Sequence, residues 1–373
     1  MSAGADLVLA GAGHAHLHVL EALAARPDLA ARTLLVTESP GSVYSGMVPG
    51  VIAGQYPLDA VLLPAAALAR SAGIEVRIAR VAGVDPAARR LRLDGGESVD
   101  FGILSLNLGS TVAGLDLPGV RAHTLATRPI GAFVRELEAR LRDRSRTPRR
   151  AVIVGAGAAG VELAFAIRAR TAAAGAPAHI TLVHGGLEIL PGSPPGLIRR
   201  VRRAARRRGI VLRTDASVEA VSADGVHVQG GGSLPADLVL WATGAAAHPL
   251  LAESGLPVDG RGFLRVRATL QVDGDDAIFA AGDSAVPEPR PDLPRAGVHA
   301  VRQGPPLARN LMALLDGGRP ESYTPQRDVL VLLNLGDGTA AGSKWGRAFQ
   351  GRAVLWLKDR IDRRFMARFS RIG

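Results

Sequence analysis

Two glycine-rich turns of the type that binds phosphate occur in this chain of 373 residues. Their glycines are Gly11 and Gly13 in the first turn, and Gly155, Gly157 and Gly160 in the second. Each turn follows an apolar, strand-like run, residues 7–10 and 151–154, and opens an alanine-rich stretch typical of a helix. Glycines there let the backbone approach a pyrophosphate, and the helix N-terminus offers it free N–H groups. The pair of turns predicts that one chain binds two dinucleotides.

The residue after the next strand of such a unit helps to select the nucleotide. In the first unit Glu38 follows the strand-like run 33–36, and a carboxylate there accepts hydrogen bonds from ribose hydroxyls. In the second unit the run 180–183 ends in His184, and no acid stands at the equivalent place. Because an acid repels the extra 2′-phosphate of NADP, the choice between NAD and NADP stays open. His184 is either a phosphate contact or a loop residue.

Two later strand-like runs end in residues that suit a ligand site. Residues 238–241 lead into a turn of small residues that contains Gly244. Residues 277–281 lead into Gly282 and Asp283. An acid at the carboxyl end of a parallel strand lies at the edge of the sheet where ligands bind.

Other segments are expected to connect or cover these units. Residues 44–50 contain two glycines and a proline, which predicts a tight, ordered loop. Residues 140–150 are polar and charged and are the best candidate for a linker between the two halves. Helices are expected over residues 199–208, which are rich in arginine, and over about 295–315.

Arginine dominates the charge of the chain. Lysine and arginine together number 45 and aspartate and glutamate 34, a net charge of +11, and only Lys344 and Lys358 are lysines. This excess is either a compositional bias or a surface for an anionic partner. The basic stretches are not interleaved with aromatic residues, so nucleic acid is not expected as a partner.

Cysteine is absent from the chain. Reduction of a disulfide, or oxidation of sulfide through a cysteine persulfide, requires thiolates beside the cofactor. The composition excludes both reactions.

No targeting segment or membrane span is expected. The apolar start lacks a basic leader, and no apolar run approaches the roughly 18 residues of a spanning helix. We expect a cytoplasmic protein, with membrane contact from one side only.

The last segment, residues 351–373, combines apolar and basic residues at helical spacing. One apolar stripe is predicted to contain Val354, Leu357, Ile361, Phe365, Phe369 and Ile372. Basic residues, Lys358 among them, are expected on the other faces. Such a helix either binds a membrane surface with anionic lipids or covers the core of the first domain.

Three histidines, His14, His16 and His18, open the first predicted helix. Side chains two residues apart on a helix point in nearly opposite directions, so these three are not expected to converge on one ion. No metal site is predicted.

Taken in order, the motifs resemble the pyridine nucleotide-disulfide oxidoreductase superfamily over residues 1 to about 315. The motifs are the two glycine turns, Glu38, Asn107-Leu108-Gly109, Ala242-Thr243-Gly244 and Ala281-Gly282-Asp283. The lack of cysteine resembles type II NADH dehydrogenases. Residues 11–16, 44–50 and 299–304 resemble the flavoprotein module found fused to selenophosphate synthetase.

The resemblance implies an α/β fold with two Rossmann-like dinucleotide-binding domains and a C-terminal helical tail. The FAD-binding domain would be split between residues 1–112 and 266–320. An NAD(P)H-binding domain, residues 113–265, would be inserted between these parts. Residues 321–373 would form the C-terminal segment that ends in the basic amphipathic helix.

The resemblance also implies which residues contact the cofactors. On the FAD side they are Gly11, Gly13, His14, His16, Glu38, Asn107, Gly109, Gly282 and Asp283. On the nicotinamide side they are Gly155, Gly157, Gly160, His184 and Gly244. His16 replaces a third glycine, so either the turn is wider or the imidazole faces the flavin phosphates. Glu38 falls one place later than the usual acid, which leaves Thr37 and Ser39 as alternatives.

Two residues are candidates for a catalytic role by the same resemblance. Glu162 would lie near the flavin and order the nicotinamide amide or relay a proton to the acceptor. Its alternative is a first-turn glutamate favoured by the helix dipole. Gln303 would lie near the flavin ring.

The leading hypothesis is an FAD-dependent NAD(P)H oxidoreductase, like type II NADH dehydrogenase, that passes electrons to a quinone or another small acceptor. A second hypothesis is a reductase of a ferredoxin-like protein, and a third is a flavin redox sensor or binding module. The acceptor, the oligomeric state, including a homodimer, and the docking of the last helix on a membrane or on the FAD domain are left open.

Overall fold

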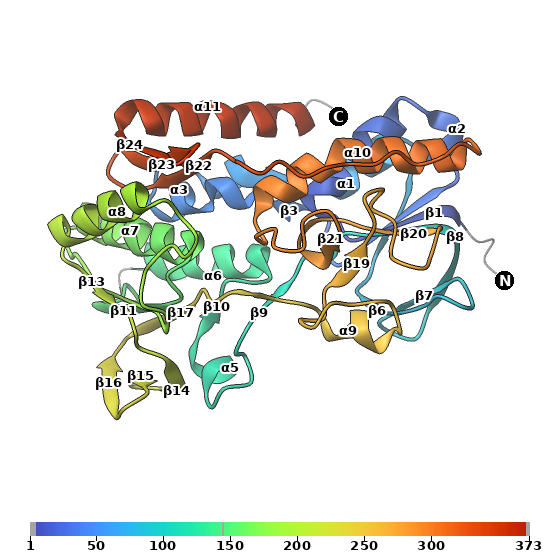
Figure 1. Ribbon diagram of the computed structural model, residues 1–373. Coiled ribbons are helices and arrows are strands. Elements are labelled where there is room, and N and C mark those ends of the chain that lie inside the picture. The colour runs from blue at the N-terminus through green and yellow to red at the C-terminus, as the bar shows by residue number, and fades with distance from the viewer. Residues whose placement is uncertain (1–4, 144, 371–373) are drawn as a thin grey trace.

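The computed structural model describes residues 5–143 and 145–370. Two sheets with helices packed on them, the first mixed and the second parallel, form the two halves of the molecule, and a small sheet and the last helix join them along one side (Figure 1). This is the α/β architecture with paired dinucleotide-binding folds that the sequence predicts.

The first half is built on a seven-stranded sheet in the order β5-β2-β1-β8-β7-β6, with β20 paired to β8. Strands β1, β2, β5, β8 and β20 pair in parallel with one another, whereas β7 pairs antiparallel with both β8 and β6. The strands are β1 (Ala5–Ala10), β2 (Thr33–Thr37), β5 (Glu75–Ile78), β6 (Val81–Asp85), β7 (Arg90–Leu93), β8 (Ser98–Leu106) and β20 (Ile278–Ala280). Buried apolar runs such as Leu7 to Ala10 suit strands covered on both faces.

Helices α1 (His14–Ala24) and α10 (Gly297–Leu315) pack against each other beside this sheet, and α4 (Ala65–Ser71) packs on α1. Smaller elements complete the half: α2 (Pro27–Ala30), the pair β3 (Ser42–Val43) and β4 (Leu62–Leu63), η2 (Leu58–Val61), η3 (Gly282–Ser284) and β21 (Ala285–Pro287). The helix expected over residues 295–315 is confirmed.

The second half contains a fully parallel sheet in the order β10-β17-β11-β12-β13. Its strands are β10 (Leu125–Ala126), β11 (Arg150–Val154), β12 (His179–Val183), β13 (Ile210–Arg213) and β17 (Leu238–Trp241). Its helices are α5 (Val120–His123), α6 (Ile130–Arg142), α7 (Ala158–Ala173) and α8 (Pro195–Arg207). One face of this parallel sheet is covered by an antiparallel sheet of β14 (Val218–Ser222), β15 (Gly225–Val228) and β16 (Gly232–Pro235). Apolar side chains of the two sheets form a cluster of their own between them.

The chain crosses between the halves twice, and the two crossings lie side by side. Strand β9 (Thr111–Val112) pairs antiparallel with β18 (Ala245–Ala246). After β18, helix α9 (Pro249–Glu253) and β19 (Leu264–Val266) place Leu251 and Leu264 in the core of the first half. The return crossing therefore comes before the boundary at residue 265 expected from the sequence, because these apolar side chains pack against the first sheet.

Residues 44–50 differ from the ordered loop expected there. They form a 3₁₀ turn, η1 (Ser45–Met47), and the start of α3 (Val48–Ile52). Pro49 lies in the first turn of α3, where its missing N–H costs no hydrogen bond. Helix α3 packs on α6 and α7, so this segment joins the two halves.

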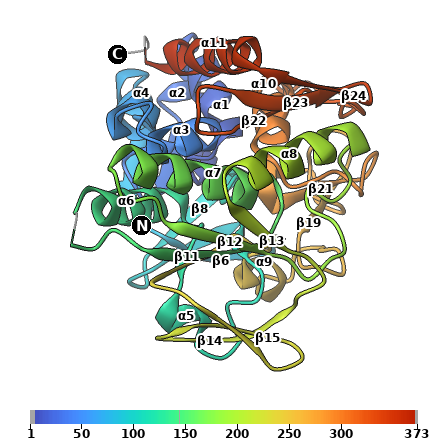
Figure 2. The same cartoon turned by 90° about the vertical axis from the view of Figure 1, so that its left-hand side faces the viewer.

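The C-terminal segment begins with an antiparallel sheet of β22 (Val331–Asn334), β23 (Ala340–Lys344) and β24 (Arg347–Gly351), followed by α11 (Arg352–Phe369). Helix α11 lies across the sheet and reaches the first half (Figures 1 and 2). None of the described helices is long and apolar enough to cross a membrane.

The predicted apolar stripe of α11 is wrong in its middle. Leu357 and Ile361 are exposed at 36% and 42%, whereas Lys358 and Asp362 are buried. Phe369 is fully buried, as the stripe requires, and Ile372 lies outside the described residues. Lys358 and Asp362 form an i,i+4 ion pair that faces inward, because Lys358 donates to the carbonyl of Gly46 and Asp362 accepts from the hydroxyl of Tyr44. The spacing along the helix does not reveal these two distant partners.

Candidate functional site

The side chain of Asn107 joins three loops at the carboxyl ends of β1, β8 and β20. Its Nδ2 donates to the carbonyl of Ala281 at 2.9 Å, and its Oδ1 accepts weakly from the backbone N–H of His16 at 3.4 Å. A Cβ on Gly13 would lie 2.3 Å from Asn107 Oδ1, and one on Gly282 would lie 2.6 Å from its Nδ2. These two glycines are required by the close approach of the asparagine.

Gly11 is required for a related reason. Its φ of +91° favours glycine, and a Cβ there would lie 2.5 Å from the carbonyl oxygen of Asn107. Its N–H donates to the carbonyl of Val36 at the end of β2. The turn is therefore bound to both neighbouring strands, and it directs the N-terminus of α1 toward the space above the sheet.

His16 lies beneath the first turn, away from any ligand. The side chain is fully buried; Nδ1 donates to the carbonyl of Gly11 at 2.6 Å, and Nε2 then accepts from the hydroxyl of Ser105 at 2.8 Å. Burial lowers the pKa of His16 to about 4, so the ring is neutral. Both ring nitrogens of His16 have partners within the protein, so the imidazole offers no free nitrogen to a phosphate.

Asp283 is held at the carboxyl end of β20 by a residue from the other half. Nη2 of Arg128, which precedes α6, lies 2.8 Å from Asp283 Oδ2 in a largely buried ion pair. The hydroxyl of Ser110 donates to the same carboxylate at 3.3 Å. The buried Gln303 accepts from the N–H of Gly282 at 2.6 Å. This hydrogen bond allows Gln303 to hold the loop that carries Asp283 in position.

Several buried polar atoms around Asp283 have no hydrogen-bond partner among the described residues. They are His14 Nε2, His299 Nδ1, and Nε and Nη2 of Arg295. Burial lowers the pKa of His14 and of His299 to about 4, and Asp283 opposes the shift in both. Donors and acceptors left unpaired in this way suit a bound ligand rich in polar groups. Together with the free N-terminus of α1, they fit the pyrophosphate and sugar chain of FAD.

Glu38 and Gly109 lie at the same edge of the first sheet. Glu38 follows β2 directly and is exposed, with its carboxylate within electrostatic reach of His248. Of the two alternatives, Thr37 is less suitable, because it is buried and its hydroxyl donates to the carbonyl of Ser39. Gly109 has a φ of +76° and open space beside it.

The second turn repeats the first with different packing. A Cβ on Gly155 would lie 2.2 Å from the carbonyl of Ala242, and one on Gly160 would lie 1.8 Å from the carbonyl of Gly155. Gly157 caps α7 with an ordinary φ of −69°, and a Cβ there would meet nothing within 4 Å. Gly155 and Gly160 are needed by the protein, whereas Gly157 leaves space that a pyrophosphate could fill.

Gly244 and His184 flank this turn from the neighbouring strands. Gly244 follows β17, is exposed, and has open space beside it. His184 follows β12, is partly buried, and its backbone bonds to Arg213 and Ala216. The nicotinamide-side residues therefore gather at the carboxyl edge of the second sheet.

Glu162 lies near the start of α7, two residues after Gly160, where the helix meets the C-terminal segment. Its Oε1 accepts from the backbone N–H of Asn334 on β22 at 2.7 Å. Burial raises the pKa of Glu162 to about 7, and the nearby cation of Lys358 opposes this shift. A carboxyl group with such a pKa can release and take up a proton near neutral pH.

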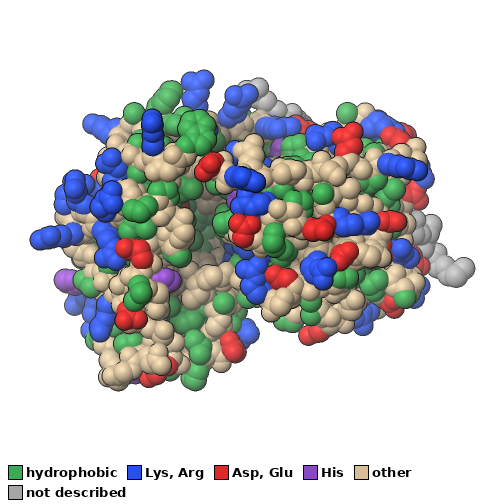
Figure 3. Space-filling view, in the orientation of Figure 1, with side chains coloured by type: hydrophobic (Ala, Val, Ile, Leu, Met, Phe, Trp, Pro, Cys, Tyr) green, Lys and Arg blue, Asp and Glu red, His purple; other side chains and the backbone are tan. Residues whose placement is uncertain are grey.

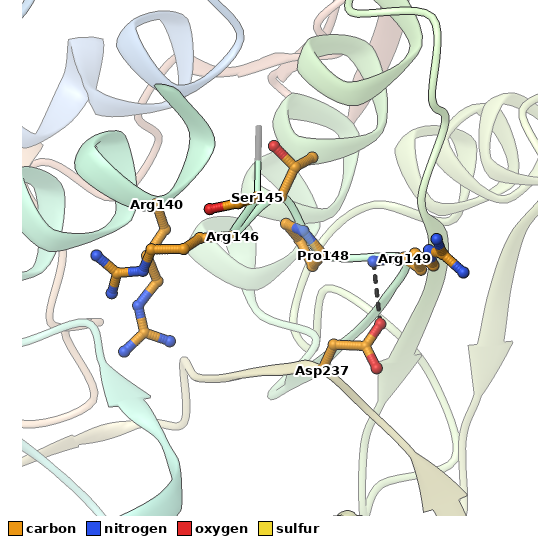
Figure 4. A pocket seen from close by; sticks show the side chains of 7 residues that line it. Arg140, Ser145, Arg146, Pro148, Arg149 and Asp237 are labelled. Carbon is orange, nitrogen blue, oxygen red and sulfur yellow. Dashed lines mark hydrogen bonds between the residues drawn. The ribbon is translucent and has the colours of Figure 1, made fainter. Parts of the chain in front are cut away.

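The surface is hollowed between the two halves (Figure 3). A separate cavity of about 420 Å³ opens at the amino ends of β11 and β17, where Asp237 accepts from the N–H of Arg149 (Figure 4). Arginines 140 and 146 line its other side. Because ligands of parallel sheets bind at the carboxyl ends, this cavity is not part of the nucleotide site.

Among the described residues, no group of three or more histidine or acidic side chains is arranged to hold a metal ion. His14 and His18, the two histidines of α1 besides His16, instead contact aromatic rings of α11.

Sequence reasoning missed the residues that other segments bring to the site. Arg128 stands in no motif, and only its neighbour Pro129 marks an irregular segment. Asn334 stands in no motif that the sequence offers, and Lys358 was expected away from the apolar stripe. Each reaches the site through tertiary packing.

Comparisons with known proteins agree with this geometry. Residues 5–304 match the sequence profile of the pyridine nucleotide-disulphide oxidoreductase family. The demethylphylloquinone reductase NdbB of Synechocystis is 30% identical over 305 residues, which cover 78% of this chain and 74% of that protein. A type II NADH:quinone oxidoreductase of Staphylococcus saprophyticus is 24% identical over 98% of this chain and 96% of its own length.

Solved structures show the same fold. The sulfide:quinone oxidoreductase of Aquifex aeolicus superposes with a TM-score of 0.83 at 16% identity, over 98% of this chain and 92% of that one. The ferredoxin reductase for the CYP199A2 system of Rhodopseudomonas palustris gives 0.75 at 22% identity, over 90% and 81%. At these identities the likeness concerns the fold alone.

Proposed function

Because the chain belongs to the pyridine nucleotide-disulphide oxidoreductase family, we propose that it is an FAD-dependent enzyme that oxidises NAD(P)H and reduces a quinone. The quinone is suggested by the names of the two relatives that align with most of the chain. The observation that carries the proposal is the combination of two dinucleotide turns with the complete absence of cysteine. Electrons would then pass from the flavin to the quinone without an internal disulfide as carrier.

We assign FAD to the first sheet and NAD(P)H to the second. FAD supplies hydride acceptance from nicotinamide and electron transfer to the acceptor. The first turn would bind its phosphates and Asp283 would accept from the hydroxyls of its sugar chain, with Arg128 as a further contact. Gln303 would keep the Asp283 loop in place, which makes it a positioning residue. The domain division that we propose follows the paired crossings β9 and β18.

On the nicotinamide side, Gly157 would admit the pyrophosphate at the N-terminus of α7. His184 occupies the position after β12 where an acid would otherwise select NAD. We therefore propose that both NADH and NADPH are accepted.

Glu162 would supply a proton when the acceptor is reduced. Reduction of a quinone to a quinol consumes two electrons and two protons, so the site needs a proton donor. Glu162 lies at the junction of α7 with the C-terminal segment, has a pKa near neutrality, and has Lys358 close by to stabilise its anion.

The protein would meet the quinone at a membrane surface from the cytoplasmic side. Large apolar side chains are exposed on β23–β24 and α11, and we call this group the tail surface: Trp345, Trp356, Leu357 and Ile361. Cationic groups stack on both tryptophans, Lys344 on Trp345 and Arg360 on Trp356. Tryptophan and arginine together suit the interface between water and lipid. This membrane contact does not require a homodimer.

Anaerobic stopped-flow mixing tests the proposal. NADH or NADPH should bleach the flavin absorbance of the purified protein, and a soluble quinone should restore it. Flavin that stays oxidised with both nucleotides would favour a sensor. Flavin that is reduced but reoxidised only by a ferredoxin-like protein, with steep inhibition by salt, would favour the protein-acceptor alternative.

A further inference from the structure

Helix α8 presents a face of unpaired arginines on the half that we assign to NAD(P)H. The exposed residues are Arg199, Arg200, Arg203, Arg206 and Arg207. Their spacing places them together, opposite the buried side chains of Leu197 and Val201. We call these five residues the α8 face.

No ion pair reaches the α8 face within residues 5–143 and 145–370. The remaining arginines of this region are paired, Arg202 with Glu188 and Arg208 with Asp337. Like charges three and four residues apart repel, as Arg199 and Arg203 do, and this repulsion destabilises a helix. An anionic surface would relieve it.

The α8 face is continuous with the tail surface. Helix α8 packs on β23 and β24, and Gly196 lies against Ala348. The hairpin between these strands carries Trp345, which is 70% exposed. From the side, α11, β24 and α8 follow one another down the same flank of the molecule (Figure 2), and basic side chains gather there (Figure 3).

We propose that the α8 face binds the phosphate groups of anionic lipids while the tail surface enters the same lipid layer. This inference rests on the proposed membrane contact and extends it to the nicotinamide half. The tail surface alone would suit any lipid, because tryptophan recognises the interface and not a headgroup charge. The α8 face adds selectivity for anionic lipid, since each arginine near such a surface is attracted to it. It would also fix the rotation of the enzyme on the membrane.

Vesicle flotation with the full-length flavoprotein tests this. The variant Arg199→Gln/Arg203→Gln/Arg206→Gln keeps residues of good helix propensity. Its matched control is Arg80→Gln/Arg92→Gln/Arg121→Gln, which removes the same charge from exposed positions outside α8 and the C-terminal segment. Of these three, Arg80 is ion-paired, with Asp94. Vesicles contain phosphatidylcholine alone or with phosphatidylglycerol, at low salt. Flavin content and soluble-quinone activity are measured in parallel.

We expect the α8 variant to bind phosphatidylglycerol vesicles roughly 100-fold more weakly than the parent, with little change on phosphatidylcholine. The control variant should lose far less of its binding to phosphatidylglycerol vesicles. Equal losses in both variants would overturn the proposal, because net charge alone would then explain binding, and so would an α8 variant that binds like the parent. An inactive parent protein that still binds through α8 would count against the proposed enzyme and in favour of the lipid site.

Discussion

Lys358 and Asp362 form a buried ion pair on the inner face of α11, with Nζ 2.8 Å from Oδ2. Both are also bound to the first half of the molecule. The hydroxyl of Tyr44 donates to Asp362 Oδ1 at 3.0 Å, and Lys358 donates to the carbonyl of Gly46 at 2.6 Å. The ring of Phe365, one turn further, stacks on Tyr44 at 4.5 Å. These contacts attach the last helix to the segment that joins the two halves.

Substitution Asp362→Asn should detach α11. It leaves Lys358 buried without its anion, and breaking a buried pair in this way typically costs about 3–5 kcal/mol. The matched control is Arg363→Gln, which removes an exposed i,i+4 pair with Asp359 worth about 0.3–0.5 kcal/mol. Limited proteolysis of the tail and thermal unfolding measure both. Equal melting temperatures for the two variants would show that the buried pair does not hold the helix.

Glu162→Gln should remove one ionisation from the acceptor half-reaction. With a pKa of about 7, Glu162 carries its proton below neutrality, so quinone reduction by the parent should slow as the pH rises past 7. In the variant the rate of quinone reduction should no longer fall above pH 7, and NAD(P)H should still reduce the flavin. An unchanged profile would remove Glu162 as the proton donor.

Glu162 also makes a stability prediction. Its pKa in the folded protein is raised from 4.5 to about 7, so the folded state binds more protons between these values. Its stabilising effect is present below pH 4.5 and is lost as the pH rises through about 7. The variant Glu162→Gln should therefore gain stability relative to the parent over this range, as chemical denaturation at each pH would show.

The histidines of α1 predict a loss of stability in acid. Burial lowers the pKa of His16 and of His18 from 6.5 to about 4, so the unfolded chain binds more protons between these values. Stability is then lost as the pH falls from 6.5 toward 4. Release of FAD fluorescence on acidification should follow the same range.

Two substitutions separate the roles of these histidines. His18 lies against Phe369 and has no hydrogen-bond partner on either ring nitrogen, the nearest oxygen of Glu21 being 3.7 Å from Nδ1. His18→Leu should reduce the sensitivity to acid without loss of stability at pH 7. His16→Leu should destabilise the protein by about 1–3 kcal/mol, since Ser105 would lose a buried partner. A larger loss of stability at pH 7 in His18→Leu than in His16→Leu would contradict this assignment.

Gly157→Ala and Gly13→Ala should fail in different ways. The first meets nothing within 4 Å, so the protein should fold normally but bind NAD(P)H more weakly, because a methyl group would occupy the place of the pyrophosphate. The second meets Asn107 at 2.3 Å and should weaken folding and flavin retention. Steady-state kinetics and thermal unfolding distinguish them. A normal KM for NAD(P)H in Gly157→Ala would argue against a nucleotide at that turn.

Arg128→Gln should weaken FAD retention by roughly 10-fold or more, as expected for the loss of a charged hydrogen-bond partner in a largely buried site. The uncompensated carboxylate of Asp283 would also repel the flavin phosphates. Dialysis at low protein concentration, followed by flavin absorbance, measures the loss. Asp283→Asn should weaken FAD retention as well, because it removes the carboxylate proposed to accept from the hydroxyls of the sugar chain. An Asp283→Asn variant that retains FAD like the parent would contradict this placement.

The sequence by itself determined the two dinucleotide folds and their order. Glycine spacing, apolar runs and small-residue turns are local properties, and they predicted β1 with α1, β11 with α7, and the strands before Gly244 and Asp283. The absence of cysteine settled which redox chemistry is unavailable. None of these conclusions depends on contacts between distant residues.

The tertiary structure decided which residues from distant segments complete the site. The ion pair of Arg128 with Asp283, the contact of Asn334 with Glu162 and the hydrogen bond from Lys358 to Gly46 each join residues far apart in the chain. Helical periodicity predicts that Lys358 is exposed and Leu357 buried, but the partners that Tyr44 and Gly46 offer to Asp362 and Lys358 turn the polar face inward. His16 shows the same limit, because its position matched the ligand motif while its ring found partners beneath the turn. Burial and pairing depend on what another segment brings to a residue, and spacing along one segment does not contain that information.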